Sequence, residues 1–344
     1  MVMLSPYETA VAAQRGPALE RADGALDLHE LIRLATLAAS SHNTQPWRFR
    51  LRAQAIEVLP DFDRRCPVVD PDDAHLFRSL GCAAENLVQA AAAQGHAAGV
   101  HFDAREQRLS VRFQPTAGLG PTPLSRALVR RQCTRRPFDG RPIDLAAYAL
   151  LEQAGTVGQA HTLLLDRPAL RDTLIDYVRA GDVAQLTDPA FRRELIHWLR
   201  FNDAEALASG DGLSGRTSGQ PSLPRWLARP LLRFVLTGQG QADTDTTNIR
   251  SAPLLAAVVA AENGPAAWVD AGRAYERLAL QATALDIRSA FINQPIEVPS
   301  LRAPLHRALG LTGGAAQLLV RLGHGPEAPF SLRRPVEEVI ELDA

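Results

Sequence analysis

Apolar residues recur at helical spacing from Leu28 to Ala39, so this segment is predicted to be an amphipathic helix. The segment Arg50–Leu59 is predicted to form a strand or hairpin. Between them lies the polar decapeptide Ser40–Phe49, a predicted helix-to-strand connector rich in hydrogen-bonding groups. The pattern leaves two interpretations open. The decapeptide is either a capped loop that satisfies helix carbonyls or a recognition loop for a flat, multiply hydrogen-bonding ligand.

An internal repeat indicates two related halves. The segment Gly81–Ala93 can be aligned with Gly272–Ala284, and both are predicted to be buried helices whose small faces permit close packing. Asp27-Leu28, which opens the first predicted helix, is echoed by Asp144-Leu145. The halves divide in the proline- and glycine-rich stretch Pro115–Pro123, which predicts a first half of residues 1–120 and a second of residues 121–344.

The second half is longer because of an insertion at about residues 167–251. It contains a predicted helical piece, Asp188–Leu207, and then a loop, a basic segment and a polar stretch. A long segment of this kind inside a compact domain is often a lid. The basic segment Arg225–Phe234 has a membrane-seeking composition, but it is short and Pro230 is expected to break it. We therefore expect it to pack over the active site or against another subunit.

Composition excludes several classes of function. Among 344 residues, 46% are hydrophobic, and the net charge of −1 provides no field to attract nucleic acid or an acidic membrane. The sequence has no lysine, which excludes a Schiff-base lysine and a phosphate-loop lysine. Three scattered cysteines and nine histidines without ligand spacing predict neither a disulfide framework nor a metal site. With no apolar stretch near eighteen residues and no signal-peptide pattern, we expect a cytoplasmic protein without a membrane span.

The decapeptide resembles the loop with which nitroreductase-like flavoproteins hold FMN, and its Ser-x-His-Asn-Thr-Gln-Pro-Trp-Arg form resembles the Acg-type branch of that superfamily. The resemblance implies these FMN-binding residues: Ser40, Ser41, Asn43, Gln45, Pro46, Trp47, Arg48 and Phe49. His42 is the candidate proton donor, with hydrogen bonding inside the loop as its other role.

Three further segments in the second half resemble the same family. The segment Arg130–Phe138 resembles its arginine-rich phosphate signature, which implies FMN contacts from Arg131, Gln132, Cys133 and Arg135. The stretch Ala290–Val298 resembles the segment whose backbone amide faces the flavin N5, here from Asn293 or Gln294. The closing segment implies phosphate contacts from Arg333, Arg334, Pro335 and Val336. The sequence departs from the family at Gln132, Cys133 and Asp286, where an arginine, a hydroxyl residue and a glycine are usual.

The resemblance implies an α+β, nitroreductase-like fold with two tandem degenerate copies that form an intramolecular pseudo-dimer. The FMN loop occurs only in the first half and the arginines only in the second, so one FMN per chain is expected. The implied function is an oxidoreductase in which NADPH or NADH reduces the flavin, which then reduces a nitro, quinone or similar small-molecule acceptor. The alternative is a flavoprotein that sequesters or stores FMN with little turnover. We expect a monomer, and further homo-oligomerisation stays open.

Overall fold

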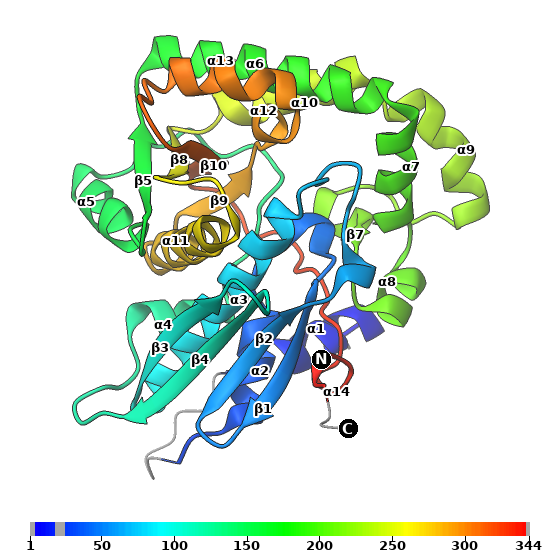
Figure 1. Cartoon of the computed structure of the whole chain (residues 1–344). Helices are drawn as coiled ribbons and strands as arrows, with labels where there is room; N and C mark the ends of the chain where they lie inside the picture. Colours follow the sequence, from blue (N-terminus) through cyan, green and yellow to red (C-terminus); the bar gives the residue numbers. More distant parts are fainter. Residues whose placement is uncertain (1–3, 18–24, 342–344) are drawn as a thin grey trace.

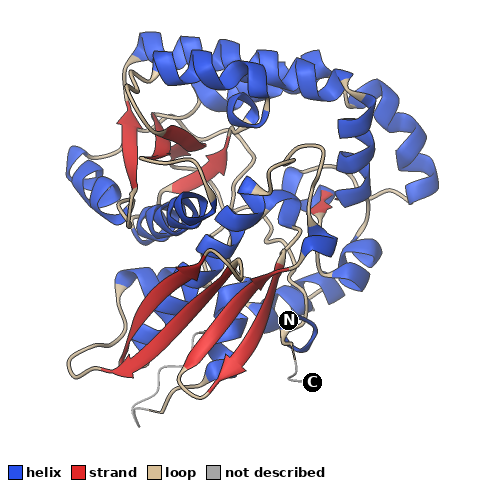
Figure 2. Ribbon diagram, viewed as in Figure 1, coloured by secondary structure: helices blue, strands red, loops and turns tan. Residues whose placement is uncertain are grey.

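The computed structural model of the chain describes residues 4–17 and 25–341. Its architecture is α+β, as predicted, with two four-stranded antiparallel sheets (Figures 1 and 2). The first sheet has the order β1-β2-β4-β3 and comprises β1 (Trp47–Arg52), β2 (Ala55–Pro60), β3 (His96–Asp103) and β4 (Arg108–Pro115). The second has the order β5-β8-β10-β9 and comprises β5 (Ala160–Leu165), β8 (Leu254–Ala260), β9 (Arg288–Phe291) and β10 (Ala315–Gly323).

The two sheets follow one plan. Numbered within its own sheet, each set of strands has the order first, second, fourth, third. A 20-residue helix joins the second strand to the third in both: α3 (Ala74–Ala93) in the first sheet and α11 (Pro265–Ala284) in the second. An aspartate caps the helix before each sheet, Asp27 for α2 (Leu28–Thr36) and Asp144 for α5 (Leu145–Ala154). The predicted echo between the halves therefore extends to strand order and to the capping residues.

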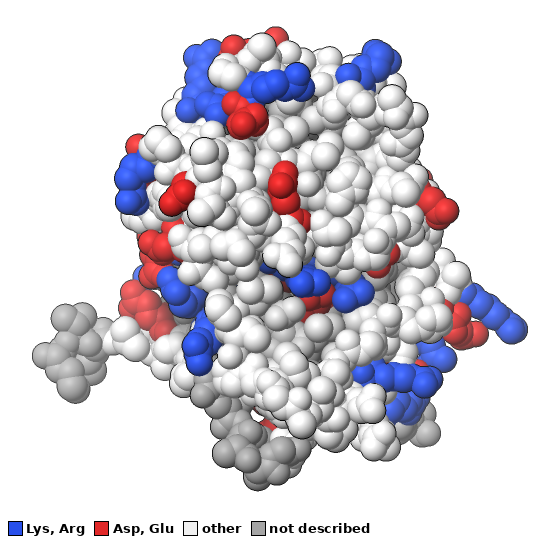
Figure 3. All heavy atoms as spheres, turned by 90° about the vertical axis from the view of Figure 1, so that its left-hand side faces the viewer, with Lys and Arg blue, Asp and Glu red and all other residues white. Residues whose placement is uncertain are grey.

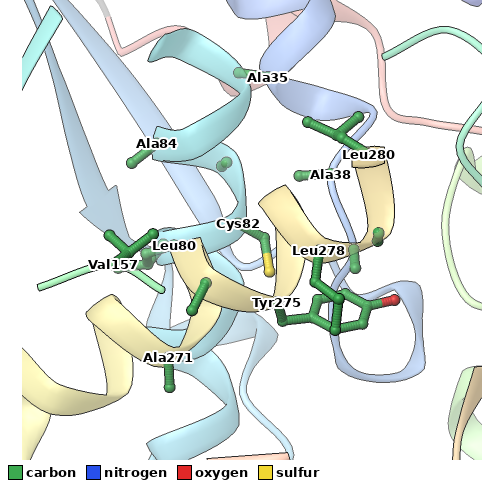
Figure 4. Packing of buried hydrophobic residues seen from close by; sticks show 14 of the residues in the cluster. Ala35, Ala38, Leu80, Cys82, Ala84, Val157, Ala271, Tyr275, Leu278 and Leu280 are labelled. Carbon is green, nitrogen blue, oxygen red and sulfur yellow. The ribbon is translucent and has the colours of Figure 1, made fainter. Parts of the chain in front are cut away.

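Helices α3 and α11 pack against each other at the centre of the molecule, where Cys82 lies between them (Figure 4). A Cβ atom on Gly272 would lie 1.9 Å from the carbonyl oxygen of Arg78, and one on Gly81 would lie 2.2 Å from that of Val269. These two contacts are equivalent, because 191 positions separate both Gly81 from Gly272 and Arg78 from Val269. The close packing predicted for the two glycine-led helices is confirmed.

Helices of the insertion extend from the second sheet toward the first (Figure 1). The insertion comprises α6 (Pro168–Thr187), α7 (Pro189–Trp198), β6 (Leu199–Arg200), α8 (Asp203–Ser209), β7 (Leu213–Ser214), a 3-10 turn (Gly215–Ser218), α9 (Arg225–Val235) and α10 (Gly238–Arg250). The remaining elements are α1 (Pro6–Gln14), 3-10 turns at Ser41–Asn43 and Phe62–Arg64, α4 (Pro123–Ala127), α12 (Gln294–Glu297), α13 (Pro299–Ala308) and α14 (Val336–Val339).

Two predictions within the insertion are wrong. The helical piece at residues 188–207 is interrupted at β6, so it forms two helices, α7 and α8. Pro230 does not break the basic segment, because α9 continues through it. A proline removes one backbone donor, and this helix nevertheless runs from Arg225 to Val235 with a marked separation of apolar and polar faces. The G-x-G-x-x-G pattern at residues 210–215 follows helix α8 and no strand, so it lacks the strand-to-helix context of a dinucleotide-binding turn.

The surface carries interspersed charges of both signs. On the face that Figure 3 shows, arginines and carboxylates alternate over a largely uncharged surface. Among residues 4–17 and 25–341, no helix is long and apolar enough to cross a membrane.

Candidate functional site

A cavity of about 800 Å³ lies where the two halves and the insertion meet. The first half contributes the start of the decapeptide and the first turns of α3, and the second contributes β9, α12 and β10. The insertion covers it with apolar side chains of α7 and α9. Its lining includes Ala39, Ser40, Ser41, His42, His75, Arg78, Cys82, Cys133, Arg135, Asp182, Asp245, Asn293, Gln294, Glu297 and Arg321. Its volume is in the range of small-molecule and cofactor sites.

The decapeptide adopts an unusual backbone conformation. Three of its residues, His42, Asn43 and Gln45, have positive φ angles of 46°, 55° and 53°. Such values are uncommon for residues other than glycine, so the surrounding structure must hold them. The Gln45 carboxamide donates to the Gly210 carbonyl at 2.9 Å and accepts from the Arg334 amide at 2.9 Å. The loop is thereby fixed to the insertion and to the C-terminal segment.

The Asn43 side chain completes this attachment. Its carboxamide donates to the carbonyls of Gly212 and Leu332, at 3.1 and 3.2 Å. The carboxamides of the loop are therefore used inside the protein, whereas Ser40, Ser41 and His42 line the cavity. Each interpretation of the decapeptide therefore applies to one part of it. The second part is a fixed internal loop, and the first part presents polar groups to the cavity.

A buried, positively charged cluster lies directly behind the cavity wall. Arg131 pairs with Glu276 at 2.7 Å, and their side chains are 2% and 0% exposed. Arg15 and Arg333 lie close enough to act on the same carboxylate, so three guanidinium groups share one carboxylate. Burial and the charge of Arg131 lower the pKa of Arg333 to about 9. The wall residue Ala39 donates its amide to Glu276 at 3.3 Å, so this cluster lies next to the cavity wall.

The arginines of this cluster also satisfy the end of helix α2. Arg333 donates to the carbonyls of Thr36, Leu37 and Ala38, at 2.7, 3.1 and 3.3 Å, and Arg131 donates to Leu37. The last carbonyls of a helix have no partner within the helix and carry partial negative charge. The two arginines therefore fix the point where the decapeptide begins.

Several donors at the cavity wall have no partner within the described part of the chain. The backbone amides of Asn293 and Gln294 donate to no protein acceptor there. The Arg78 Nε and Arg321 Nη1 atoms are buried without a hydrogen-bond partner. Buried donors are normally satisfied, so unsatisfied ones at a cavity indicate a missing acceptor. The wall formed by these residues therefore fits an anionic or acceptor-rich ligand.

Buried carboxyl groups gather where α6, α10 and α12 meet. Gln294 donates from Nε2 to both Asp182 and Asp245, at 3.0 Å each. Gln185 donates to Glu297 at 2.7 Å, and His75 Nε2 lies 3.6 Å from the other Glu297 oxygen. Burial, followed by the charge of Asp245, raises the pKa of Asp182 to about 8. Burial likewise raises the pKa of Glu297 to about 7.

The two cavity histidines are neutral at pH 7. Burial and then the charge of Arg135 lower the pKa of His42 to about 4. Burial also lowers the pKa of His75, and the neighbouring Arg78 adds to the effect. His42 can therefore offer a hydrogen bond to a ligand, but it carries no imidazolium proton at neutral pH.

Comparison with known proteins places the chain. A protein of Mycobacterium tuberculosis named "Putative NAD(P)H nitroreductase" is 27% identical over 97% of this chain and 97% of its own. Another of that organism, with the same name followed by acg, is 25% identical over 91% of this chain and 95% of its own. The chain is therefore similar to putative NAD(P)H nitroreductases over nearly its whole length. No family model matches it.

Solved structures add a weaker likeness to this nitroreductase-like chain. The FMN-dependent nitroreductase NfnB from Mycobacterium smegmatis, in complex with NADPH, is 14% identical with a TM-score of 0.42. The match covers 64% of this chain and 98% of that chain.

The nitroreductase-like chain brings only part of the predicted site to the cavity. The cavity lining includes Ser40, Ser41, His42, Cys133, Arg135, Asn293 and Gln294. The other predicted residues lie outside it: Asn43, Gln45, Pro46, Trp47, Arg48, Phe49, Arg131, Gln132, Arg333, Arg334, Pro335 and Val336. Trp47 and Phe49 are fully buried in the core. The side-chain donors of Arg131 and Arg333 are engaged with Glu276 and with helix carbonyls, so their effect on a ligand is through charge.

Sequence reasoning missed the residues that α3, β10 and the insertion supply to the cavity. Arg78, Asp182, Asp245 and Arg321 belong to none of the flavin-like motifs, and Glu297 lies in the N5-like stretch without being singled out there. One departure from the family is explained, because Asp286 has a φ of 57°, a conformation that glycine adopts without strain. Of the missed residues, Asp182 follows Gly181, and that glycine was the available signal. A Cβ atom there would lie 2.6 Å from the Cβ of Gln294.

The raised pKa of Asp182 predicts a pH-dependent stability. The folded state holds this proton up to about pH 8, whereas the unfolded chain loses it near pH 4. Stability should therefore fall as pH rises between these values, and the Asp182→Asn variant should lack that loss. We expect the melting temperature of the variant, relative to the parent protein, to increase from pH 5 to pH 8 by a few degrees.

Asp243→Asn is the control for this measurement. Asp243 lies on the neighbouring helix α10, but a hydrogen bond from Arg179 lowers its pKa, so it is ionised in both states over this range. The difference in melting temperature between Asp243→Asn and the parent protein should therefore not change with pH. If the difference in melting temperature between Asp182→Asn and the parent protein stayed constant with pH, the raised pKa of Asp182 would be contradicted. Asp245 and Glu297 raise that pKa, and Arg179 lowers it.

Proposed function

We propose that this chain is an FMN-dependent oxidoreductase, in which NADPH or NADH reduces the flavin and the flavin reduces a nitro, quinone or similar electron-poor acceptor. The nitroreductase names of its relatives support this class of reaction. The observation that carries the proposal is the position of the cavity. It lies between the decapeptide and the segments at residues 133–135 and 290–294, which sequence resemblance assigns to the flavin.

The residues at the cavity fit an FMN molecule. The unpartnered amides of Asn293 and Gln294 can donate to flavin ring acceptors, and Ser40 and Ser41 can contact the ribityl chain. The phosphate carries close to two negative charges, which the excess charge of Arg15, Arg131 and Arg333 favours. Arg135, exposed at the cavity wall, supplies a further guanidinium group. When bound, FMN would supply hydride acceptance and donation.

The chain itself positions and isolates this chemistry. Ser40, Ser41 and the amides at residues 293–294 orient a flat ligand, and the strained decapeptide is held rigidly by Asn43 and Gln45. Side chains of α9 from the insertion, Ala228, Leu231 and Leu232, line one side of the cavity and reduce its contact with water. His42 donates or accepts a hydrogen bond as a neutral imidazole.

The repeated plan supports a pseudo-dimer with one flavin site. In this proposal residues 1–120 and 121–344 are two degenerate nitroreductase-like halves, and residues 167–251 are a lid inserted in the second. The equivalent buried glutamates illustrate how the halves diverged. Glu276 lies beside the cavity wall with three arginines, whereas Glu85 is paired with Arg273 and Arg277. No second copy of the decapeptide precedes β5.

A spectroscopic titration tests the proposed function. The purified protein should show a flavin spectrum or acquire one with added FMN, with one flavin per chain. Under anaerobic conditions NADPH or NADH should bleach it, and an added quinone or nitroarene should restore it. Protein that takes up no FMN would refute the proposal, and two flavins per chain would refute the single-site arrangement.

The second candidate function is FMN sequestration, which the apolar side chains of α7 and α9 over the cavity favour. The same titration distinguishes it from the oxidoreductase. Helices α7 and α9 contribute apolar residues to the wall, including Phe191 and Leu195 from α7 and Leu231 and Leu232 from α9, so a bound flavin would be enclosed. In a storage protein the flavin should resist NADPH and NADH but be bleached by dithionite.

A further inference from the structure

The acidic wall of the cavity is not accounted for by the proposed FMN contacts. It consists of Asp182 from α6, Asp245 from α10 and Glu297 from α12, and we call these three residues the acidic wall. All three line the cavity. Asp182 and Asp245 lie in the insertion, outside the flavin-like motifs, whereas Glu297 follows Gln294 on α12. A doubly negative flavin phosphate gains no charge-assisted contact from carboxyl groups, so this wall suits a different ligand group.

Two glycines bring the acidic wall together. A Cβ atom on Gly181 would lie 2.6 Å from the Cβ of Gln294, so this glycine lets α6 approach α12. A Cβ atom on Gly238 would lie 2.8 Å from the Cα of Val183, so a second glycine lets α10 approach α6. Asp182 lies between these two contacts in the chain. The convergence of the carboxyl groups is thus a consequence of close helix packing on both sides of one residue.

The acidic wall is supplied with neutral partners. Within the described part of the chain, the donors to Asp182 and Glu297 are the carboxamides of Gln294 and Gln185, and neither Asp182 nor Asp245 forms an ion pair there. In that part of the chain, no nearby guanidinium group forms an ion pair with these three residues. Arg321, which acts on Asp245, donates to the carbonyls of Thr134 and Arg136. Burial of carboxylates without a counter-ion is costly.

Two acceptor atoms of this wall remain unsatisfied. Asp182 is 2% exposed, and its Oδ2 atom is buried without a hydrogen-bond partner. The Oε1 atom of Gln294 also lacks a partner, although the same side chain donates to Asp182 and Asp245. Both atoms belong to residues that line the cavity. A group that brings two or more N–H donors and a positive charge would satisfy both acceptors and neutralise the carboxylates.

We propose that the acidic wall is a subsite for a cationic, N–H-bearing group of the electron acceptor, such as a primary ammonium or an amidinium. This proposal rests on the proposed function, because it assigns the acceptor chemistry of the same cavity. The cavity then has two poles: the anionic cofactor faces the arginine cluster behind Ala39, and a basic acceptor faces Asp182, Asp245 and Glu297.

The test compares two nitroarenes of nearly equal size, para-nitrobenzylamine and para-nitrobenzyl alcohol. Binding is measured by calorimetry, first with the protein as purified and then after saturation with FMN. We expect the amine to bind at least about tenfold more tightly than the alcohol, as a charge-assisted contact requires. In the Asp182→Asn and Asp245→Asn variants the ratio of the two affinities, amine over alcohol, should fall to about one.

Asp172→Asn is the matched control, because Asp172 is an exposed aspartate on the same helix as Asp182 and does not line the cavity. It should leave the ratio unchanged. The Asn variants are nearly isosteric, and a circular dichroism spectrum like that of the parent protein shows that they fold. If one fails to fold, the other carries the test.

The outcomes separate this subsite from the flavin proposal. A ratio near one in the parent protein, or a high ratio that survives both Asn substitutions, would overturn the subsite even if the protein binds FMN. Protein that fails to take up FMN would refute the proposed function, whereas the ratio in the flavin-free protein would still report on the acidic wall.

Discussion

The Glu276→Gln variant is expected to lose on the order of 3–5 kcal/mol of unfolding free energy, as when one partner of a buried ion pair is removed. Glu276 is 0% exposed and is the carboxylate that Arg131 pairs with at 2.7 Å. Arg15 and Arg333 also act on it. Glutamine keeps the shape of the side chain but leaves three buried guanidinium groups without that charge. The measurement is a urea unfolding curve, whose midpoint should fall.

Glu337→Gln is the control for Glu276→Gln. Glu337 faces His29 at 3.4 Å, but its side chain is 75% exposed, and exposed pairs contribute at most about 1 kcal/mol. Its unfolding curve should therefore match that of the parent protein. Equal midpoints for the two variants would mean that Glu276 does not balance the arginine cluster. Phosphate or FMN added to the Glu276→Gln protein should restore part of the loss, because an anion beside Ala39 replaces the missing charge.

Local pattern was sufficient to predict the elements around the decapeptide. The apolar spacing from Leu28 to Ala39 defined α2, and the segment Arg50–Leu59 lies in the β1–β2 hairpin. Both signals are local, since helix and strand periodicity depend on residues a few positions apart. The glycine-led helices were also predictable, because Gly81 and Gly272 stand at equivalent positions of a repeat.

The orientation of charged side chains was not predictable in the same way. Arg131 lies in a basic segment that resembles a phosphate-binding signature, yet its partners, Glu276 and the Leu37 carbonyl, are distant in sequence. Asp182 and Asp245 belong to an insertion without a recognisable motif, and they meet only because α6, α10 and α12 pack closely. Such arrangements depend on tertiary packing, which a linear pattern does not encode.

The Gly272→Ala variant tests the packing on which the whole site depends. An alanine is ordinarily about 1 kcal/mol more favourable than glycine inside a helix. Here its Cβ atom would lie 1.9 Å from the carbonyl oxygen of Arg78, a backbone atom that cannot rotate away. We therefore expect a net loss of about 3 kcal/mol or more, at or beyond the upper range for overpacked cores.

The same substitution should also weaken FMN binding in the proposed function, because Arg78 and Cys82 on α3 line the cavity and α3 must move. Gly99→Ala is the control, since a Cβ atom at Gly99 in β3 would meet nothing within 4 Å. Urea unfolding and flavin titration of both variants provide the comparison. If Gly272→Ala were as stable as Gly99→Ala, the two central helices would not be in the close contact that positions the cavity.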